Sequence, residues 1–267
     1  MIKSYTLFFD GQKHEVVKIL RNRYKKSLLK YFGKFTPIAR ANVTTVSMDL
    51  NFYYQDIVRA CFPNAEIIIE RFHMFQMLTR SFNSLRVLVM KSFDKCTRQY
   101  QLLKSPWKIY HKSFADLDKI HPRYNWHFKD YLTQEQIVME GISCDPRLDN
   151  AYNLMQDFMA ALKARDTKVL REIIDTKAEV GTFMHKTLLT FKHNLRAVLN
   201  GARFSYSNGC LEDFNRKIKQ IERTAYGYSN YINLLTRIRL EENKVKEKEP
   251  SNLYIAWFFK SLLINRI

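Results

Sequence analysis

Acidic and basic side chains gather on one side of the segment formed by residues 206–228. Hydrophobic residues recur there at helical spacing and draw an apolar stripe (Leu211, Phe214, Ile218 and Ile221). The opposite face carries one acid and a row of bases (Glu212, Arg216, Lys219 and Arg223), with Asn215 beside them. A carboxylate next to cations suits a metal ion bound beside a phosphate. The alternative is an ordinary helix, in which an acid in the first turn is favoured by the dipole and pairs with a base one turn later.

This predicted helix has recognisable ends. Ser207 and Asn208 precede it in a turn cluster, and an asparagine there can cap the first turn by accepting a backbone N–H. Gly227 lies between two tyrosines and is expected to close the segment. A metal site would need a second carboxylate from elsewhere in the chain.

The best second carboxylate is Asp49, which directly follows a compact β-branched run at residues 43–48. A second such run at residues 65–69 delivers Glu70, Arg71 and His73 at its end. Strands alternate here with helical patterns, and open α/β sheets place function at the carboxyl ends of their strands. The alternatives are that Asp49 only caps the next helix and that His73 is a core or capping histidine.

Two carboxylates on a rigid sheet edge would suit Mg²⁺, which prefers hard oxygen ligands and keeps some of its water. Cleavage and transfer of phosphodiesters use two such ions, one at the attacking oxygen and one at the leaving oxygen. Asp49 and Glu212 fit that demand. The four cysteines are far apart, and the histidines of the middle region lack metal-ligand spacing, so a zinc site is not expected.

The composition favours a polyanion as the partner. The chain has 267 residues, with 44 Lys+Arg against 26 Asp+Glu, and a net charge of +18. Nucleic acid is the usual partner of such a folded basic domain. A membrane surface is disfavoured because the bases are spread over the whole chain, and neither a signal peptide nor a spanning segment is expected. The cysteine usage favours a reduced cytosolic compartment.

The sequence predicts four regions. Residues 1–73 read as strands and helices of an α/β unit, with strands at 4–9, 14–20, 43–48 and 65–69 and a helical pattern interrupted at Pro37. Residues 74–204 carry helical stripes without a convincing strand and are expected to form an α-helical insertion. Residues 205–240 hold the basic helix. Residues 241–267 are a charged linker and an apolar tail, with Tyr254, Trp257 and Phe258 at helical spacing.

Several of these motifs together resemble the DDE transposases of bacterial insertion sequences, specifically the ISL-three family. The matching segments are Val46-Ser-Met-Asp49, residues 62–73 (FPNAEIIIERFH), and residues 206–212 (YSNGCLE) continuing through Arg223-Thr-Ala-Tyr-Gly-Tyr228. The resemblance implies a ribonuclease-H-like α/β core interrupted by a large α-helical insertion. Asp49 matches the family's second catalytic aspartate and Glu212 its catalytic glutamate. The family usually has Asp where Glu70 stands.

The resemblance also implies partners and cofactors. It predicts Mg²⁺ or Mn²⁺ at Asp49 and Glu212, the ends of the insertion element and target DNA as substrates, and a place at the nucleoid in the bacterial cytoplasm. A homo-oligomer or pairing with a full-length transposase is expected. Six residues are predicted to hold the DNA backbone, which positions DNA without reading its sequence (Arg71, His73, Asn215, Lys217, Lys219 and Arg223).

One departure from the family pattern concerns the first catalytic aspartate. Family members carry it on a strand upstream of the segment that matches residues 5–23, so this chain reads as truncated at its N-terminus and as inactive alone. The missing strand would lie centrally, between the strands at residues 4–9 and 43–48, and its loss would leave buried backbone groups unpaired. We therefore expect a poorly folding or rearranged sheet. Asp10 is a poor substitute for the missing acid, and Glu70 is a second candidate.

Two other functions stay open at this point. The first is a catalytically dead remnant that binds DNA or another protein, such as a full-length transposase. The second is a basic helical RNA-binding protein, which would need stacking aromatic residues on an exposed sheet; the sequence predicts no such arrangement.

Overall fold

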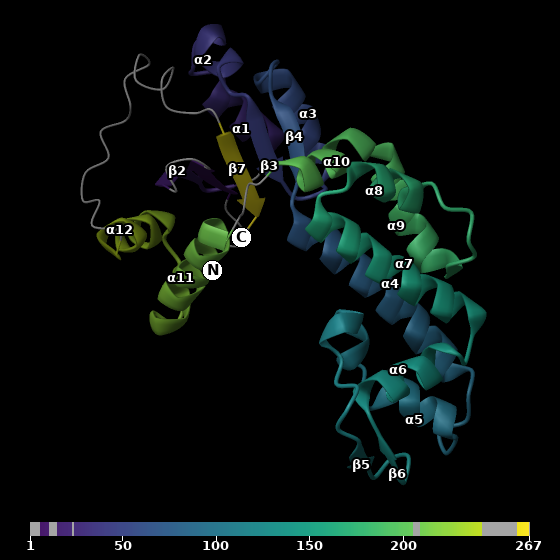
Figure 1. Cartoon of the computed structure of the whole chain (residues 1–267). Helices are drawn as coiled ribbons and strands as arrows, with labels where there is room; N and C mark the ends of the chain where they lie inside the picture. Colours follow the sequence, from purple (N-terminus) through teal and green to yellow (C-terminus); the bar gives the residue numbers. More distant parts are fainter. Residues whose placement is uncertain (1–5, 11–14, 23, 205–208, 242–260, 267) are drawn as a thin grey trace. The chain divides into compact units, whose positions relative to one another are not determined.

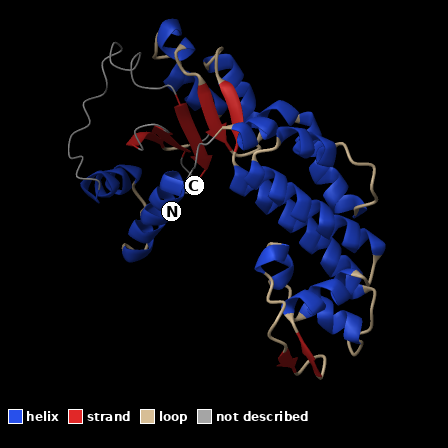
Figure 2. Ribbon diagram, in the orientation of Figure 1, coloured by secondary structure: helices blue, strands red, loops and turns tan. Residues whose placement is uncertain are grey.

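A computed structural model describes residues 6–10, 15–22, 24–204, 209–241 and 261–266. The chain divides into two compact units, one formed by Met1–Glu70 with Phe204–Ile267 and the other by Arg71–Arg203. The architecture is mixed α/β, with helices dominating and the main sheet in the first unit (Figure 2). None of the described helices is long and apolar enough to cross a membrane.

The first unit is built on a five-stranded sheet in the order β2-β1-β7-β3-β4 (Figure 1). Its strands are β1 (Thr6–Asp10), β2 (Glu15–Leu20), β3 (Thr45–Met48), β4 (Glu66–Ile69) and β7 (Ser261–Arg266). β1 and β2 pair antiparallel, with a bulge opposite Phe8 and Phe9, and β3 and β4 pair parallel. All four residues of β3 are buried, as expected for an inner strand.

The central strand of this sheet comes from the C-terminal tail. β7 runs antiparallel to β1 and parallel to β3, with Ile264 opposite both Phe8 and Met48. The expectation of a missing strand and a rearranged sheet stays a prediction; what the structure shows is β7 between β1 and β3. The helical spacing at residues 254–258 lies outside the described residues.

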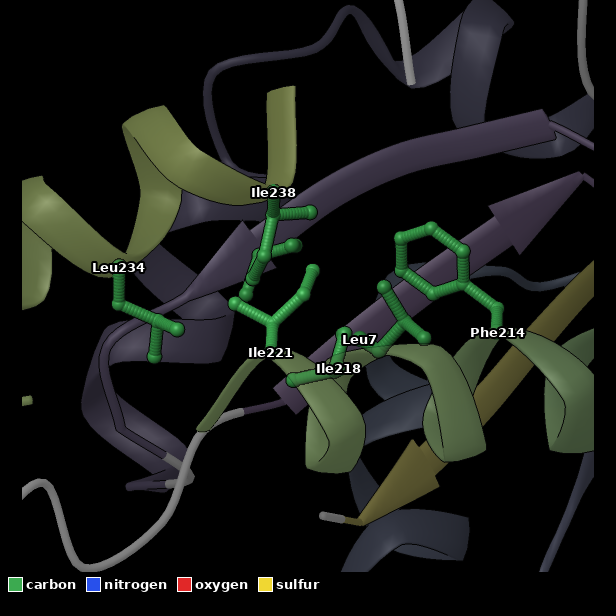
Figure 3. Packing of buried hydrophobic residues seen from close by; sticks show 7 residues of the cluster. Leu7, Phe214, Ile218, Ile221, Leu234 and Ile238 are labelled. Atoms are coloured by element: carbon green, nitrogen blue, oxygen red, sulfur yellow. The ribbon is translucent and has the colours of Figure 1, made fainter. Parts of the chain in front are cut away.

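Helices cover both faces of β1, because successive side chains of a strand point to opposite sides. Phe8 contacts the ring of Phe32 at the end of α1 (Lys25–Phe32), with 5.0 Å between the centroids. Leu7 packs on the other face against Phe214 and Ile218 of α11 (Gly209–Thr224) (Figure 3). α12 (Tyr231–Glu241) joins this second layer through Leu234 and Ile238, and the Tyr231 hydroxyl donates to the Ile19 carbonyl at 2.6 Å.

The shorter helices of the first unit begin and end as their residues predict. α2 (Pro37–Ala41) starts at its proline, with the Thr36 hydroxyl accepting from the Ala39 N–H. α3 (Phe52–Cys61) is capped by Asn51. α11 ends in a Schellman motif, in which the N–H groups of Tyr226 and Gly227 donate to Arg223 and Glu222 carbonyls at 3.1 and 2.8 Å. Tyr226 itself adopts a left-handed backbone (φ 54°), so Gly227 shares the turn rather than making it alone.

The second unit is a helical body. Its α-helices are α4 (Arg71–Lys91), α5 (Arg98–Lys104), α6 (Gln134–Ile142), α7 (Pro146–Ala164), α8 (Thr167–Ile174), α9 (Gly181–His193) and α10 (Leu195–Arg203), with short 3₁₀ turns at Ile109–His111 and Phe114–Asp116. α4 packs against α7 and α9. The stacked rings of Phe158 and Phe191, 5.4 Å apart, and the contact of Phe82 with Tyr152 fill this core.

The expectation of no strand in this region is wrong. β5 (Arg123–Asn125) and β6 (Asp130–Leu132) form a short antiparallel hairpin, with Tyr124 opposite Tyr131. Its turn places Lys129 at a positive φ of 54° without a glycine, so the usual hairpin signal is missing from the sequence. The prediction of residues 74–204 as an insertion into a catalytic core stays a prediction.

Candidate metal and DNA site at the sheet edge

Two carboxylate residues leave neighbouring parallel strands at the same level of the sheet. Met48 is in register with Ile69, so Asp49 and Glu70 are each one residue beyond the last pair. The Glu70 N–H donates to the Met48 carbonyl at 3.3 Å and extends the ladder to this point. Neighbouring strands are about 4.8 Å apart, which is close enough for two carboxylates to share a cation. Both residues are half-buried.

Asp49 is not the N-cap of the helix that follows it. The Asn51 side chain takes that role by accepting from the Tyr53 N–H at 3.1 Å, and the Asp49 carbonyl accepts from the Asn51 N–H at 2.7 Å. The helix cap that the sequence allowed at Asp49 is therefore formed by Asn51.

On its other side Asp49 has Asn265 as the neighbour in register. Met48 pairs with Ile264, so the next residue of β7 stands beside Asp49. Three adjacent parallel strands thus bring Asn265, Asp49 and Glu70 to one level of the carboxyl edge. Sequence reasoning missed Asn265, because nothing local in the tail indicates that it enters the sheet between β1 and β3.

Asp10 lies toward the opposite end of the sheet. It pairs with Leu262, which pairs with Val46, three residues before Asp49. Three residues at about 3.3 Å and two strands at about 4.8 Å place the two aspartates about 14 Å apart. That separation is too large for Asp10 and Asp49 to share an ion.

Glu212 lies in the first turn of α11, and its side chain is outside the described residues. The helix itself is well anchored, since Phe214, Ile218 and Ile221 pack on the face of the sheet that carries Leu7. Leu7 is in register with Asn265, the neighbour of Asp49. Alternation along the strands places Asp49 on this same face. The pairing of Asp49 with Glu212 stays a prediction.

Comparison with known proteins decides the family. The chain matches the ISL3 family of DDE transposases (DDE_Tnp_ISL3, described as Transposase) over residues 2–238. The chain belongs to this transposase family. A curated protein of Lactococcus lactis subsp. lactis named ATP-dependent protease is 34% identical over 110 residues, which are 41% of this chain and 36% of that protein. The chain therefore spans about a third of the length of that relative. No solved structure matches.

Membership of the transposase family implies a divalent metal ion. Within the part of the chain that the structure describes, no three His, Cys, Asp or Glu residues are grouped as a metal site. The donor chemistry at the sheet edge still fits Mg²⁺ or Mn²⁺, because Asp49 and Glu70 supply hard carboxylate oxygens. This fit concerns two ligand positions.

The predicted DNA-binding residues of the chain fall into two groups. Arg71 and His73 begin α4 in the second unit, where the Arg71 guanidinium donates to the carbonyls of Gly201 and Ala202 at 2.8 and 3.1 Å. Both carbonyls lie in the last turn of α10, where a cation is stabilising. Burial lowers the pKa of Arg71, and the nearby Arg165 lowers it further. A phosphate contact of Arg71 stays a prediction beside this structural role.

The second group lies on α11, and its members differ in how exposed they are. Lys219 and Arg223 are exposed on the face opposite the apolar stripe. Lys217 donates from Nζ to the Glu241 carbonyl at 3.0 Å, at the end of α12. The buried Oδ1 of Asn215 has no hydrogen-bond partner among the described residues. Lys219 and Arg223 are therefore the members of this group best placed to meet a DNA backbone.

Proposed function

We propose that this chain is the catalytic domain of a DNA transposase, which cleaves the ends of an insertion element and joins them to target DNA. Its carboxylates would be Asp49 and Glu212. The observation that carries the proposal is the position of Asp49 at the carboxyl end of a buried inner strand, on the face of the sheet that α11 covers. Family membership supports DNA as the substrate class.

A ribonuclease-H-like core belongs to the same proposal. Its support is the strand arrangement, in which the central position beside β3 is filled by a strand parallel to β3 and antiparallel to β1. The large helical unit between β4 and α11 would then be the family's insertion. Both statements rest on the strand order and on the family.

The chain's own residues would bind and orient the DNA. Asp49 and Glu212, with Glu70 beside Asp49, would hold a divalent ion, which when bound activates the attacking oxygen and stabilises the leaving oxygen. Lys219 and Arg223, which lie in the C-terminal half of α11, would attract the phosphate backbone to this helix. α11 packs on the sheet through Phe214 and Ile218, which would fix this helix against the face that carries Leu7. Catalysis of this kind depends on such positioning more than on covalent chemistry.

We further propose that the chain alone is inactive, for a reason found in the sheet. The register position beside Asp49 on the central strand holds Asn265, whose amide carries no charge. An amide is a weaker ligand than a carboxylate and cannot neutralise a divalent ion. The same observation favours a second candidate function, which is a catalytically silent DNA-binding remnant that pairs with a full-length transposase.

Cleavage of the element's own end DNA, in Mg²⁺ or Mn²⁺, tests these proposals. The proteins are the unchanged chain, Asp49→Ala, Glu212→Ala, Asn265→Asp, and Asn265→Asp combined with Asp49→Ala, Glu212→Ala or Asp56→Asn. Asp56→Asn is the matched control, since it removes an exposed carboxylate of α3 away from the edge. We expect cleavage only in Asn265→Asp and in its Asp56→Asn derivative.

The other outcomes have distinct meanings. Cleavage by the unchanged chain that disappears in Asp49→Ala would keep the site and refute the role given to Asn265. Cleavage that survives both Asp49→Ala and Glu212→Ala would refute the site itself. DNA binding by every protein without cleavage by any would favour the remnant.

A further inference from the structure

The β5–β6 hairpin of the second unit carries three aromatic side chains on one face. Tyr124 and Tyr131 are a cross-strand pair, with 5.1 Å between the ring centroids. Trp126 stands edge-on to Tyr124 at 5.0 Å. Their exposed fractions are 82% for Trp126, 67% for Tyr131 and 40% for Tyr124. The sequence predicts no aromatic residues on an exposed sheet, so this arrangement is a correction made by the structure.

The hairpin is firmly attached to the helices behind it. Phe128 and Leu132 pack with Leu102 of α5 and Ile137 of α6 in a small core of their own. Arg98 of α5 binds Asp130 of β6 at 3.1 Å and Glu140 of α6 at 2.9 Å, and the Glu140 hydrogen bond raises the pKa of Arg98. Isolated two-stranded hairpins are marginal in water, so these anchors are what hold the three rings in place.

Exposed aromatic residues in contact with each other are costly to leave in water and mark interaction sites. The charges around this face favour an anionic partner. Arg123 and Lys129 flank the rings in sequence, and neither side chain forms an ion pair with the described residues. The one acid of the hairpin, Asp130, is paired with Arg98. Exposed aromatic rings on a chain of net charge +18 are the combination that binds unpaired nucleobases, by stacking on the rings and by attraction of the backbone.

We propose that the face formed by Tyr124, Trp126 and Tyr131 is a stacking site for unpaired bases of DNA. Trp126 is the main platform, because its ring is the largest and the most exposed of the three. The ligand class is single-stranded DNA or an unpaired end of duplex DNA. The proposal rests on DNA as the substrate of the chain and requires neither the metal ion nor Asp49.

A protein partner is the other occupant that such a face could have, since Trp and Tyr are also frequent in protein interfaces. The surrounding charge argues against it. Interface cores are depleted of charged residues, whereas this short hairpin also carries the exposed cations Arg123 and Lys129. The neighbouring Ile120, which is 79% exposed, offers a matched control. It is an apolar side chain without a π-face, so its removal affects apolar docking but not stacking.

The test is fluorescence anisotropy of the full chain with labelled oligonucleotides, in EDTA so that cleavage plays no part. The probes are a 12-nucleotide single strand of DNA, a blunt duplex of the same sequence, and the RNA version of the single strand. The variants are Trp126→Ala, Trp126→Phe, Ile120→Ala and Arg123→Gln. Size-exclusion chromatography of each protein reports its oligomeric state.

We expect Trp126→Ala to weaken binding of single-stranded DNA by about fivefold to a hundredfold, the range for removal of one stacking ring. Trp126→Phe should keep most of the affinity for single-stranded DNA. Ile120→Ala should not weaken this affinity, and Trp126→Ala should not weaken binding of the blunt duplex. Arg123→Gln should weaken all probes alike and lower the slope of affinity against salt by about one.

Three outcomes would overturn the proposal. Equal loss on duplex and single strand in Trp126→Ala would show a backbone contact instead of stacking. A preference for the RNA strand would assign the face to RNA. Unchanged DNA binding together with an oligomer that Trp126→Ala dissolves would make the face a protein interface. Because no metal is present, a failure of the proposed cleavage reaction leaves each of these results interpretable.

Discussion

The tail strand β7 should be essential to the sheet of the first unit. Deleting residues 261–267 removes the central strand and leaves the inner edges of β1 and β3 without partners. β7 shares five register pairs with β1 and four with β3. A ladder carries about one backbone hydrogen bond per pair. At about 1 kcal/mol each, the lost bonds amount to about 9 kcal/mol. That figure is comparable with the whole stability of a typical domain, about 5–15 kcal/mol.

The loss should be confined to the first unit, because Arg71–Arg203 forms a compact unit with its own core. Hydrogen exchange followed by mass spectrometry measures this directly. In the deletion variant, amides of β1 and β3 should exchange at rates near those of an unfolded chain. Amides of α7 and α9 should keep their protection. The helical signal in far-ultraviolet circular dichroism should fall only by the share of α1, α2, α3, α11 and α12.

A single substitution distinguishes the effect of β7 pairing from the effect of removing the tail residues. Leu263 is in the middle of β7, opposite Phe9 and Ser47. Leu263→Pro removes an N–H and does not fit an inner strand, so it should reproduce the deletion. Leu263→Val keeps both the N–H and the preference for strands, and should behave like the unchanged chain. Unchanged protection of β1 and β3 in the deletion variant would refute the central position of β7.

Three further predictions concern stability. Gly141→Ala would place a methyl group against the buried ring of Tyr110, 2.8 Å from Cζ, and should cost about 1–3 kcal/mol in chemical denaturation, less if combined with Tyr110→Leu. Tyr226→Gly relieves a left-handed backbone at a fully exposed residue and should raise stability by about 1 kcal/mol; no change would show that the Schellman turn is unstrained. Asp145 caps α7 and binds Arg147, whose hydrogen bond lowers the pKa of this carboxyl. Its stabilisation should therefore be complete above the usual pKa of Asp and disappear as the pH falls through the lowered value, and a pH series in which Asp145→Ala shows the same slope would contradict it.

Local signals in the sequence sufficed for most of the first unit. Pro37 separates two helices as predicted, and the β-branched runs at residues 43–48 and 65–69 become β3 and β4. The apolar stripe of α11 packs inward as its spacing predicts. In each case the residues that form the element also determine its environment, through proline geometry, β-branching or helical periodicity.

Longer-range pairing was not accessible in the same way. Ser261–Arg266 contains two leucines, one isoleucine and no turn signal, which suits either a helix or a strand. Its strand form depends on a position between β1 and β3, and those strands are distant from it in the chain. The β5–β6 hairpin was missed for a related reason. Its turn lacks glycine, and Phe128 and Leu132 gain their stability from α5 and α6.

The central position of β7 connects the stability of the sheet to the composition of the candidate site. Without it, the sheet would consist of two separate pairs, β1 with β2 and β3 with β4. The strand that joins them also supplies the residue beside Asp49. A loss of cleavage after deletion of the tail could therefore reflect unfolding or a missing ligand position. Asn265→Asp resolves this ambiguity, because it changes the charge beside Asp49 and leaves the backbone pairing of β7 intact. If the register is as described, this substitution alone should strengthen Mn²⁺ binding in a manner that Asp49→Ala reverses.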